Sequence, residues 1–553
     1  MGVIVSLIKV IQFKLTITPI KISSFVIHLK EIINNDLDGE MYYKANFISP
    51  GYSEEITFKA KDLNNKNKFM DLLEHPNFIF TGSQNDLQEI KKILSMQDYE
   101  TLKGVSYIGF YQESNGRVFI TQDKAIDASF KEVTDLTINE DNKVVSTDIL
   151  KYKEITKEEL ERLWTFLFDF NELKITASLI SMLPIMLMKP LLFEEGIKTQ
   201  HLVIYGEAGA GKSQTVKTIV EPFFSISKDN ILSCSNVTQF SLLKSLSNSN
   251  AIPIILEEYK PSFLSDSQKR LISDGLRNTY DCHTATRGTK NQQLINYTML
   301  APIVLVGEEG QEETAIKERS VILNFNKEGR KGKEKSFYFL KNNPYLLRKL
   351  GRTILNRVIK MDIDFMLERR NELISKFVSN NITEDRVVES VGNILLGFSI
   401  VADLYKEYEL HFEQVTGVKV VDIIQAINDN TFTEVLDESS NTKSIIDNTI
   451  ELLGSMRENY VIGNQDYTFV NNDTELALNI TSIYPKLTKF VKEYNVSTEI
   501  ITNQRQFTKQ LKKASYFVDY KTVRFKDIPR KAYVLNMEAL ENKNIDIEVL
   551  KNM

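Results

Sequence analysis

The sequence predicts an α/β fold in which a phosphate-binding loop lies at the carboxyl edge of a parallel sheet. A G-x-x-x-x-G-K-S motif (206–213) stands between an apolar run and a segment with apolar residues at helical spacing. Forty-five residues after the motif's lysine, a second apolar run ends in Glu257 and Glu258. Parallel strands that end at one edge bring their loops together there, so the motif and the two acids are expected to share a site.

The motif has the residues that a triphosphate requires. Glycines let successive backbone N–H groups point at phosphate oxygens, and the following helix adds partial positive charge at its N-terminus. Lys212 is expected to neutralise the β- and γ-phosphates of ATP, and the Ser213 hydroxyl to ligate Mg²⁺. The predicted nucleotide contacts are Gly206, Gly209, Ala210, Gly211, Lys212, Ser213 and Gln214.

Composition indicates a soluble, multidomain, intracellular protein. The 553 residues suffice for about three or four domains, and the 42% hydrophobic and 26% charged contents are ordinary. Cys234 and Cys282 offer neither a disulfide framework nor a zinc ribbon, which favours the cytoplasm and no structural metal. The net charge of -6 argues against non-specific nucleic-acid binding by the whole surface but leaves room for local basic patches.

Two apolar stretches resemble membrane segments. Residues 1–13 lack a basic n-region and a small-residue cleavage site, so we expect a buried strand there. Residues 177–193 contain two prolines and a lysine and are short for a span, so we expect a core helix beneath the nucleotide domain and no membrane contact.

The first 150 residues carry no cluster of chemistry-bearing side chains. Short β-like runs (47–48, 56–59, 78–81 and 117–121) mix with helix-like pieces such as 86–95, which predicts an accessory α/β domain. Residues 154–193 are patterned as helix and lead directly into the phosphate loop.

The acids after the second strand are the predicted catalytic groups. Glu257 is expected to bind Mg²⁺, and Glu258 to orient and polarise the attacking water. The alternative is a solvated strand end, which is common for a lone strand. The order and spacing relative to Lys212 favour catalysis.

A third strand (303–306) is followed by a helical piece that ends at Arg319 and by a further strand. This spacing puts Arg319 outside its own nucleotide pocket. In ring-shaped ATPases an arginine so placed reaches the neighbouring subunit's γ-phosphate. The alternative is a surface salt bridge with Glu318 or Glu313.

These motifs together resemble the AAA+ ATPases. Within them the chain looks like the superfamily-three and minichromosome-maintenance-like replicative helicases of phages, plasmids and chromosomal islands. The segments LEEYKPS, LRNTYDCHTATRGTKNQQL and LAPIVLVGEEG resemble the ATPase modules of primase-helicases, and GVSYIGFYQESNGRVFITQDKAI looks like the domain before them. The resemblance covers about residues 100–540.

The resemblance implies two further features. Such helicases insert a basic β-hairpin into a central pore, and Arg287 and Lys290 flank a glycine in the corresponding interval. An ordinary surface turn is the alternative. The usual sensor position carries Asn or Thr, whereas here Glu308 follows Gly307, so water positioning by that residue is in doubt.

Residues 341–440 are helix-patterned and fit a lid or linker. Arg348 or Arg352 could supply a second nucleotide-sensing arginine, although spacing distinguishes neither.

The C-terminal hundred residues predict a winged helix. Two amphipathic helices (482–494 and 502–514) precede a period-two strand (520–526), a turn (527–531) and a returning strand (532–535). From Lys486 to Lys531 there are twelve Lys and Arg but four acids, which favours contact with DNA phosphates. The predicted DNA-binding residues, including the pore pair, are Arg287, Lys290, Arg505, Lys509, Lys512, Lys513, Arg524 and Lys526.

The sequence thus predicts an α/β protein with an N-terminal accessory domain (1–150), a P-loop AAA+-type core (151–340), a helical lid (341–440) and a winged helix (441–553). The expected function is an ATP- and Mg²⁺-dependent DNA helicase or translocase of a mobile element. Single-stranded DNA would lie in the pore of a homo-oligomeric ring, expected to be a hexamer, and duplex DNA at the winged helix. Lys212, Glu258 and Arg319 are the catalytic residues. The alternatives are a non-processive origin-binding initiator or helicase loader, and a protein-remodelling AAA+ ATPase.

Overall fold

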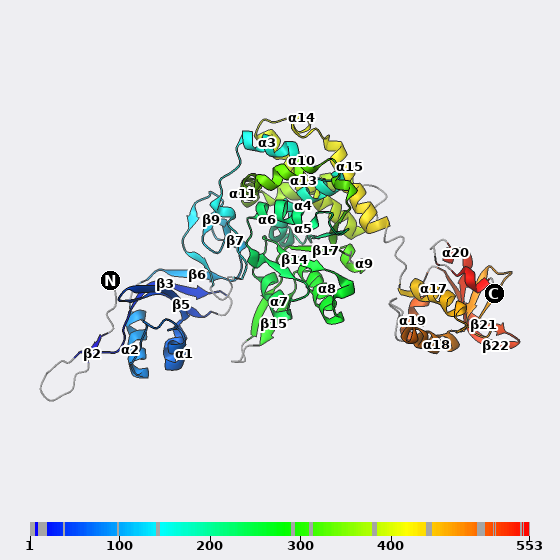
Figure 1. The fold of residues 1–553 in the computed structure, drawn as a ribbon, viewed down its shortest axis with the longest axis horizontal. Coiled ribbons are helices and arrows are strands. Elements are labelled where there is room, and N and C mark those ends of the chain that lie inside the picture. The colour runs from blue at the N-terminus through cyan, green and yellow to red at the C-terminus, as the bar shows by residue number, and fades with distance from the viewer. Residues whose placement is uncertain are drawn as a thin grey trace. The chain divides into compact units, whose positions relative to one another are not determined.

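The computed structural model describes residues 6–8, 19–36, 39–96, 99–139, 144–288, 294–308, 313–378, 384–437, 445–494, 504–512, 514, 516–541, 545 and 547–551. The chain divides into two compact units, Met1–Glu434 (unit 1) and Val435–Met553 (unit 2), which are described separately (Figure 1).

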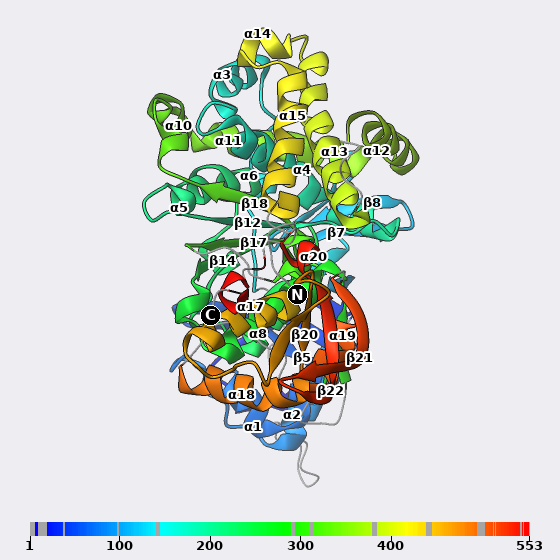
Figure 2. The same ribbon diagram turned by 90° about the vertical axis from the view of Figure 1, so that its right-hand side faces the viewer.

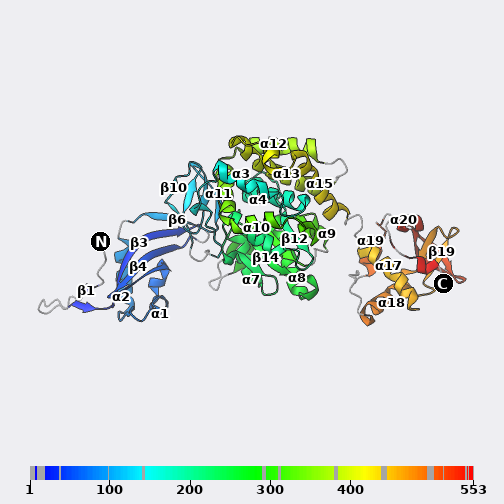
Figure 3. The same ribbon diagram turned by 45° about the horizontal axis from the view of Figure 1, so that its top comes forward.

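Unit 1 begins with a five-stranded mixed sheet of order β11-β6-β3-β4-β5. Its strands are β3 (Val26–Asn35), β4 (Met41–Ser49), β5 (Tyr52–Lys59), β6 (Thr101–Val105) and β11 (Leu136–Ile138). Helices α1 (Lys66–Asp71) and α2 (Gln84–Ser95) lie on one side of it (Figure 3). Between them and the sheet is a core that contains Phe47 and Phe69.

The strand predicted over 78–81 is wrong, because only an isolated bridge from Phe80 to Ser23 forms there. Before the sheet, β1 (Ser6–Ile8) pairs with β2 (Pro19–Lys21). The rest of the N-terminal strand predicted over 1–13 lies outside the described residues.

A second, antiparallel sheet of order β10-β9-β8-β7 follows. Its strands are β7 (Gly109–Glu113), β8 (Gly116–Ile120), β9 (Ala125–Asp127) and β10 (Glu132–Val133). The side-chain amide of Asn250 joins this sheet to the later part of unit 1, since it exchanges hydrogen bonds with the backbone N–H and C=O of Phe110 (2.9 and 2.8 Å).

The centre of unit 1 is a five-stranded parallel sheet of order β13-β14-β17-β12-β18. Its strands are β12 (His201–Gly206), β13 (Ile231–Ser233), β14 (Ile254–Tyr259), β17 (Ile303–Gly307) and β18 (Ser320–Phe325). Four of them are apolar runs that are buried along most of their length, as strands covered on both faces must be, whereas the edge strand β13 is only partly buried. The phosphate loop leaves β12, and Glu257 and Glu258 belong to β14.

Helices surround this sheet. They are α3 (Lys157–Leu167), α4 (Leu173–Glu194), α5 (Lys212–Thr215), α6 (Glu221–Phe224), α7 (Gln239–Ser247), α8 (Asp266–Tyr280), α9 (Thr314–Lys317), α10 (Glu334–Asn342), α11 (Pro344–Lys360), α12 (Ile363–Phe377), α13 (Asp385–Glu407), α14 (Phe412–Thr416) and α15 (Val420–Thr431). One π-helical turn (Val216–Val220) joins α5 to α6.

Helices α4, α13 and α15 pack side by side (Figure 2). Two of them, α4 and α13, are long and apolar enough to cross a membrane, but 94% and 78% of their apolar windows are buried inside the protein. Helix α4 covers the stretch for which the sequence predicted a core helix, and its buried face explains the apolar composition.

A β-hairpin extends between α8 and β17. Its strands β15 (Thr284–Gly288) and β16 (Leu294–Thr298) are antiparallel, with Thr284 opposite Thr298. The sequence predicted a hairpin in this interval with a turn at Gly288. Gly288 instead ends β15, because the strand pairing continues to Leu294.

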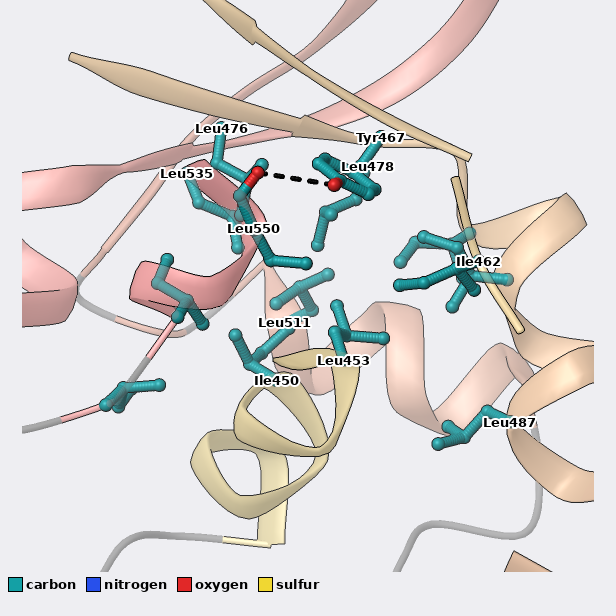
Figure 4. Packing of buried hydrophobic residues seen from close by; sticks show 14 of the residues in the cluster. Ile450, Leu453, Ile462, Tyr467, Leu476, Leu478, Leu487, Leu511, Leu535 and Leu550 are labelled. Atoms are coloured by element: carbon teal, nitrogen blue, oxygen red, sulfur yellow. Dashed lines mark hydrogen bonds between the residues drawn. The ribbon is translucent and has the colours of Figure 1, made fainter. Parts of the chain in front are cut away.

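Unit 2 contains α17 (Ile445–Glu458), β19 (Tyr467–Val470), β20 (Glu475–Leu478), α18 (Ile480–Glu493), α19 (Gln504–Leu511), β21 (Phe517–Phe525), β22 (Ile528–Asn536), α20 (Met537–Glu541) and α21 (Glu548–Lys551). The sheet order is β19-β20-β22-β21, all antiparallel. Figure 4 shows its apolar core, in which Leu453, Leu487 and Leu511 come from three different helices.

The last hairpin turns earlier than the sequence predicted. The turn consists of Lys526 and Asp527, not of residues 527–531, and both have positive φ (46° and 67°). Two successive left-handed residues match the right-handed twist of the flanking strands. Pro529, which lies within the predicted turn, is paired opposite Arg524 inside the ribbon.

Candidate nucleotide-binding site

The phosphate loop is shaped by glycines with backbone conformations that other residues avoid. Gly206 has φ +129°, and a Cβ there would lie 2.0 Å from the carbonyl oxygen of Phe325. Gly211 has φ +95° and is the residue before α5. Glycine adopts these conformations without the strain that a side chain would add. A glycine loop that leads into a helix N-terminus is an arrangement that binds anions.

Lys212 folds back into this loop. Its Nζ donates hydrogen bonds to the carbonyl oxygens of Gly206 (2.8 Å) and Glu207 (2.7 Å). Burial lowers the pKa of the ammonium group. Because the lysine's partners are neutral carbonyls, a phosphate group that entered the loop would offer it a stronger, charged acceptor.

The two acids of β14 occupy an irregular point in the strand. The pairing of β14 with β17 shifts register between Leu256 and Tyr259, and Glu258 has φ +62°. Bulges and positive φ values at non-glycine residues are features that redirect side chains at functional sites. One Glu258 carboxylate oxygen accepts a hydrogen bond from the Ser233 hydroxyl at the end of β13 (2.7 Å).

One pocket of about 530 Å³ collects these groups. It is lined by Ala208, Gly209, Gly211, Lys212, Ser213, Gln214, Lys217, Glu257, Glu258, Lys260, Val306, Gly307, Glu308 and Arg330. The predicted contact residue Ala210 is buried behind the loop, and its N–H donates to the carbonyl oxygen of Glu207 (3.2 Å). The remaining predicted residue, Gly206, faces Lys212 through its carbonyl.

Glu257 has the environment that a cation ligand needs. Within the described part of the chain its buried Oε1 has no hydrogen-bond partner. No group of three or more His, Cys, Asp or Glu among the described residues could hold a metal alone. A site with one carboxylate and one serine hydroxyl fits Mg²⁺, which binds through few protein ligands together with substrate phosphates and water.

Among comparisons with known proteins, only the comparison with solved structures found similar proteins, and it shows a shared fold. No family model matches the chain, and no curated protein matches its sequence. The solved structure described as "SCCmec type IV Cch - active helicase" aligns with 95% of this chain and 96% of its own, at 12% identity and a TM-score of 0.58. The chain shares the fold of that helicase.

Two further structures align more weakly. The apo NrS-1 C-terminal region covers 92% of this chain and 96% of its own, at 11% identity and a TM-score of 0.33. The Aeropyrum pernix ORC2 protein in its ADP form covers 71% and 97%, at 13% identity and a TM-score of 0.18. These two scores are too low to carry an argument. The parallel sheet and the phosphate loop after β12 confirm the predicted α/β fold with a P-loop core, and the first alignment shows the same fold in a solved structure.

Arg319 lies at the other end of the sheet from this pocket. It directly precedes β18, where Ser320 pairs with His201, whereas the phosphate loop begins at Gly206 opposite Phe325. Five strand residues correspond to roughly 17 Å. The side chain lies over the Tyr280 ring (5.3 Å) and donates to the carbonyl oxygen of Ala315.

The salt bridge considered for Arg319 does not form. Glu318 pairs with Arg386 (2.8 Å), and Glu313 pairs with Arg277. β18 is an edge strand of the sheet, so Arg319 lies at an edge and outside its own pocket, as the spacing predicted.

Several pocket residues were missed by the sequence analysis. Lys260 follows β14 and pairs with Glu308 (2.8 Å), the acid at the tip of β17. Arg330 follows β18, and its guanidinium lies so close to the loop that a Cβ on Gly211 would be 2.3 Å from it. The ring of Phe337 lies 4.9 Å from the guanidinium and supports it. The only sequence signal for Arg330 was that it is a basic residue soon after β18, the last strand of the core sheet.

The second-arginine candidates lie beside the pocket, not in it. Arg348 lines a neighbouring hollow with Gln214 and Lys217 and donates to the Tyr152 hydroxyl (2.9 Å). Arg352 donates to the carbonyl oxygen of Leu150 (3.3 Å).

The predicted DNA-binding residues are only partly described. Lys290 and Lys513 lie outside the described residues, as does the side chain of Arg287 on β15. In unit 2, Arg505 and Lys509 are exposed on α19, Lys512 follows that helix, Arg524 is exposed on β21, and Lys526 is in the turn.

Proposed function

We propose that this chain is an ATP-dependent DNA helicase or translocase that acts in the replication of a mobile genetic element. The observation that carries the proposal is the single pocket in which Lys212 and Ser213 of the phosphate loop meet Glu257 and Glu258 of β14. That set of groups is what hydrolysis of a nucleoside triphosphate requires. The expected compartment is the cytoplasm.

The phosphate loop binds the substrate. Its N–H groups and Lys212 hold the β- and γ-phosphates, and Lys212 exchanges its carbonyl partners for phosphate oxygens. Ser213 and Glu257, whose Oε1 has no hydrogen-bond partner among the described residues, would hold Mg²⁺, which would neutralise phosphate charge. The substitution Glu257→Gln should therefore raise the Mg²⁺ concentration needed for half-maximal ATP hydrolysis.

Glu258 orients and polarises the attacking water. Its exposed carboxylate is tethered by the Ser233 hydroxyl, which holds it at the pocket wall until substrate arrives. A carboxylate in this role typically contributes about 10² to 10⁴ in rate.

A ring of identical subunits completes the site. Arg319 is too far from its own loop to act there, so it reaches the γ-phosphate bound by the next subunit, for which it must leave Tyr280 and Ala315. Six subunits are the expected number.

DNA is bound at two places. The β15–β16 hairpin, with Arg287 and Lys290, grips single-stranded backbone in the pore. The element order of unit 2, in which helices precede the β21–β22 hairpin, supports a winged helix with α19 as the recognition helix and β21–β22 as the wing. Its duplex contacts are Arg505, Lys509, Lys512, Lys513, Arg524 and Lys526.

The solved protein that shares this fold is described as an active helicase. This supports unwinding over the two alternatives, namely an initiator or loader that remodels DNA without processive unwinding, and a protein-remodelling ATPase.

The test is strand displacement on a forked DNA with ATP, using the wild type, Lys212→Ala and Glu258→Gln. We expect the wild type to separate the strands and both variants to fail, with Glu258→Gln still binding ATP. Hydrolysis and DNA binding without displacement would favour the loader. Hydrolysis without any DNA affinity would favour the protein-remodelling ATPase.

A further inference from the structure

Unit 2 has an aromatic and basic surface whose two tyrosines, Tyr520 and Tyr533, are not among the predicted duplex contacts. Tyr520 of β21 and Tyr533 of β22 are paired directly across the ribbon, with ring centroids 4.6 Å apart. Lys512 Nζ lies 5.0 Å from the Tyr520 ring and 5.8 Å from the Tyr533 ring, and Lys531 Nζ lies 5.7 Å from the Tyr520 ring. These four residues are called the tyrosine platform.

Core packing explains the position of Tyr533 but not that of Tyr520. Tyr533 is half-buried and packs against the helical core beside Phe517. Tyr520 is 41% exposed. The apolar residues of the ribbon's opposite face, such as Val523 and Ala532, form their own small cluster. Tyr520 therefore lies beside a tyrosine that is packed on the core, and part of its own ring surface is open to solvent.

The platform's cations are uncompensated. Lys486 and Lys521 elsewhere in unit 2 pair with Asp466 and Glu475. By contrast, Lys512 and Lys531 have no carboxylate partner within the described part of unit 2. Contacts between exposed ammonium groups and aromatic rings are weak. Both lysines are therefore available to a stronger anion.

Arg524 extends this charge along the same face. It lies four residues from Tyr520, and side chains two and four apart in a strand share a face. Four strand residues correspond to roughly 13 Å, so Arg524 lies further along the same face from the Tyr520 ring.

We propose that the tyrosine platform binds an unpaired nucleotide of single-stranded DNA. The base stacks on Tyr520, which Tyr533 supports from behind, and the flanking phosphates bind Lys512, Lys531 and Arg524. A ring face bordered by cations is the arrangement that binds single strands with little sequence preference. In a duplex the bases are stacked on each other and present no face to Tyr520. The inference rests on the proposed function for its DNA substrate, and it reassigns Lys512 and Arg524 from the duplex to the separated strand.

The experiment uses the full chain without nucleotide and two readouts. Fluorescence anisotropy compares a single strand, the same strand with abasic positions, and a blunt duplex. Photocrosslinking of a 5-iodouracil single strand, mapped by mass spectrometry, reports the contact residue and separates the platform from other DNA-binding surfaces.

Tyr520→Leu should weaken binding of the single strand by about five-fold or more, given the usual contribution of base stacking. It should remove the crosslink and leave duplex affinity within about two-fold. Tyr520→Phe should behave as wild type, because stacking needs the ring and not the hydroxyl. On the abasic strand, wild type and Tyr520→Leu should bind equally. The matched control is Tyr460→Leu, which removes another exposed tyrosine of unit 2 (81% exposed) and should change nothing.

Wild-type affinity of Tyr520→Leu for the single strand, or an equal loss on duplex and single strand, would overturn the proposal. The crosslink tests the tyrosine platform and ATP hydrolysis tests the proposed motor, so either result can be negative without the other. A chain that crosslinks at Tyr520 but does not hydrolyse ATP would refute the proposed motor and keep the platform, and the reverse result would do the opposite.

Discussion

Arg330 is the residue whose position most changes the account of the nucleotide pocket. Its guanidinium lies against Gly211, is supported by the Phe337 ring, and has no carboxylate partner among the described residues. A second cation in the same subunit would share the phosphate charge with Lys212, since hydrogen bonds between charged groups are the stronger kind.

Arg330→Ala should therefore raise the dissociation constant for ATP by about ten-fold, with Arg330→Lys intermediate. Equilibrium binding of a fluorescent ATP analogue measures this, with Lys335→Ala, an exposed lysine of α10 outside the pocket, as the control. Unchanged affinity in Arg330→Ala would mean that the arginine only packs on the loop.

His201 should make unit 1 sensitive to acid. The imidazole is buried at the start of β12, and its Nε2–H donates to the carbonyl oxygen of Leu276 (2.7 Å). Burial, assisted by the charge of Lys189, lowers the pKa of His201 to about 3 from 6.5. Between these values the unfolded chain binds a proton that the folded chain does not. Stability is therefore lost as pH falls below 6.5, by about 2 kcal/mol at pH 5.

The measurement is the melting temperature from pH 7.5 to 5 for the wild type and His201→Gln. We expect the wild type to lose more over this interval than the variant, whatever their difference at pH 7.5. Parallel profiles would contradict this origin of the acid sensitivity.

The sequence predicted those site residues that belong to short contiguous patterns. Lys212, Ser213, Glu257 and Glu258 were found because a loop motif and a strand end are contiguous patterns, and their pocket follows from parallel strands ending at one edge. Lys260, Ser233 and Arg330 were not found. Their role depends on which side chains the sheet order brings to the loop, and a single sequence carries no record of that proximity.

Among the elements, α11 is tied most closely to the phosphate loop's helix. Gly351 of α11 packs on α6, and a Cβ there would lie 1.8 Å from the carbonyl oxygen of Phe223. The contact is between backbones, so a side chain at 351 must push the helices apart.

Gly351→Ala should destabilise unit 1 by about 1–3 kcal/mol, the usual cost of overpacking, and should also weaken ATP binding because α6 continues from α5. Thermal unfolding and ATP titration test both effects. Tyr345→Ala, at an exposed position of the same helix, is the control. A stable variant with normal ATP affinity would show that α11 adjusts without disturbing the loop.

Periodicity predicted four elements of unit 2 and missed the others, including the 14-residue helix α17. The helices α18 and α19 and the strands β21 and β22 follow clear 3.6- and 2-residue patterns. The short hairpin β19–β20 has four residues per strand, too few for a pattern. The final turn was misplaced because the left-handed conformations of Lys526 and Asp527 have no strong sequence signature without glycine.

At the scale of the whole molecule, the account requires that subunits share active sites. Lys212→Ala and Arg319→Ala should each abolish hydrolysis alone, because one removes the phosphate ligand and the other the neighbour's arginine. In an equimolar mixture about a quarter of the interfaces would combine an intact Lys212 with an intact Arg319 from the adjacent subunit.

Partial ATPase activity in that mixture is the expected result, measured by phosphate release after subunit exchange. Two variants of the same residue, Lys212→Ala and Lys212→Met, serve as the control mixture and should remain inactive. An inactive mixture of the Lys212→Ala and Arg319→Ala variants, or an active Arg319→Ala homo-oligomer, would contradict an active site shared between subunits.

The most direct measurement of the central claim is a comparison of ATP binding and single-turnover hydrolysis by the wild type and Glu258→Gln at saturating Mg²⁺. Our account predicts that both proteins bind ATP with similar affinity and that the variant hydrolyses it at least about 10²-fold more slowly. Equal hydrolysis rates, or a wild type that does not bind ATP, would contradict it.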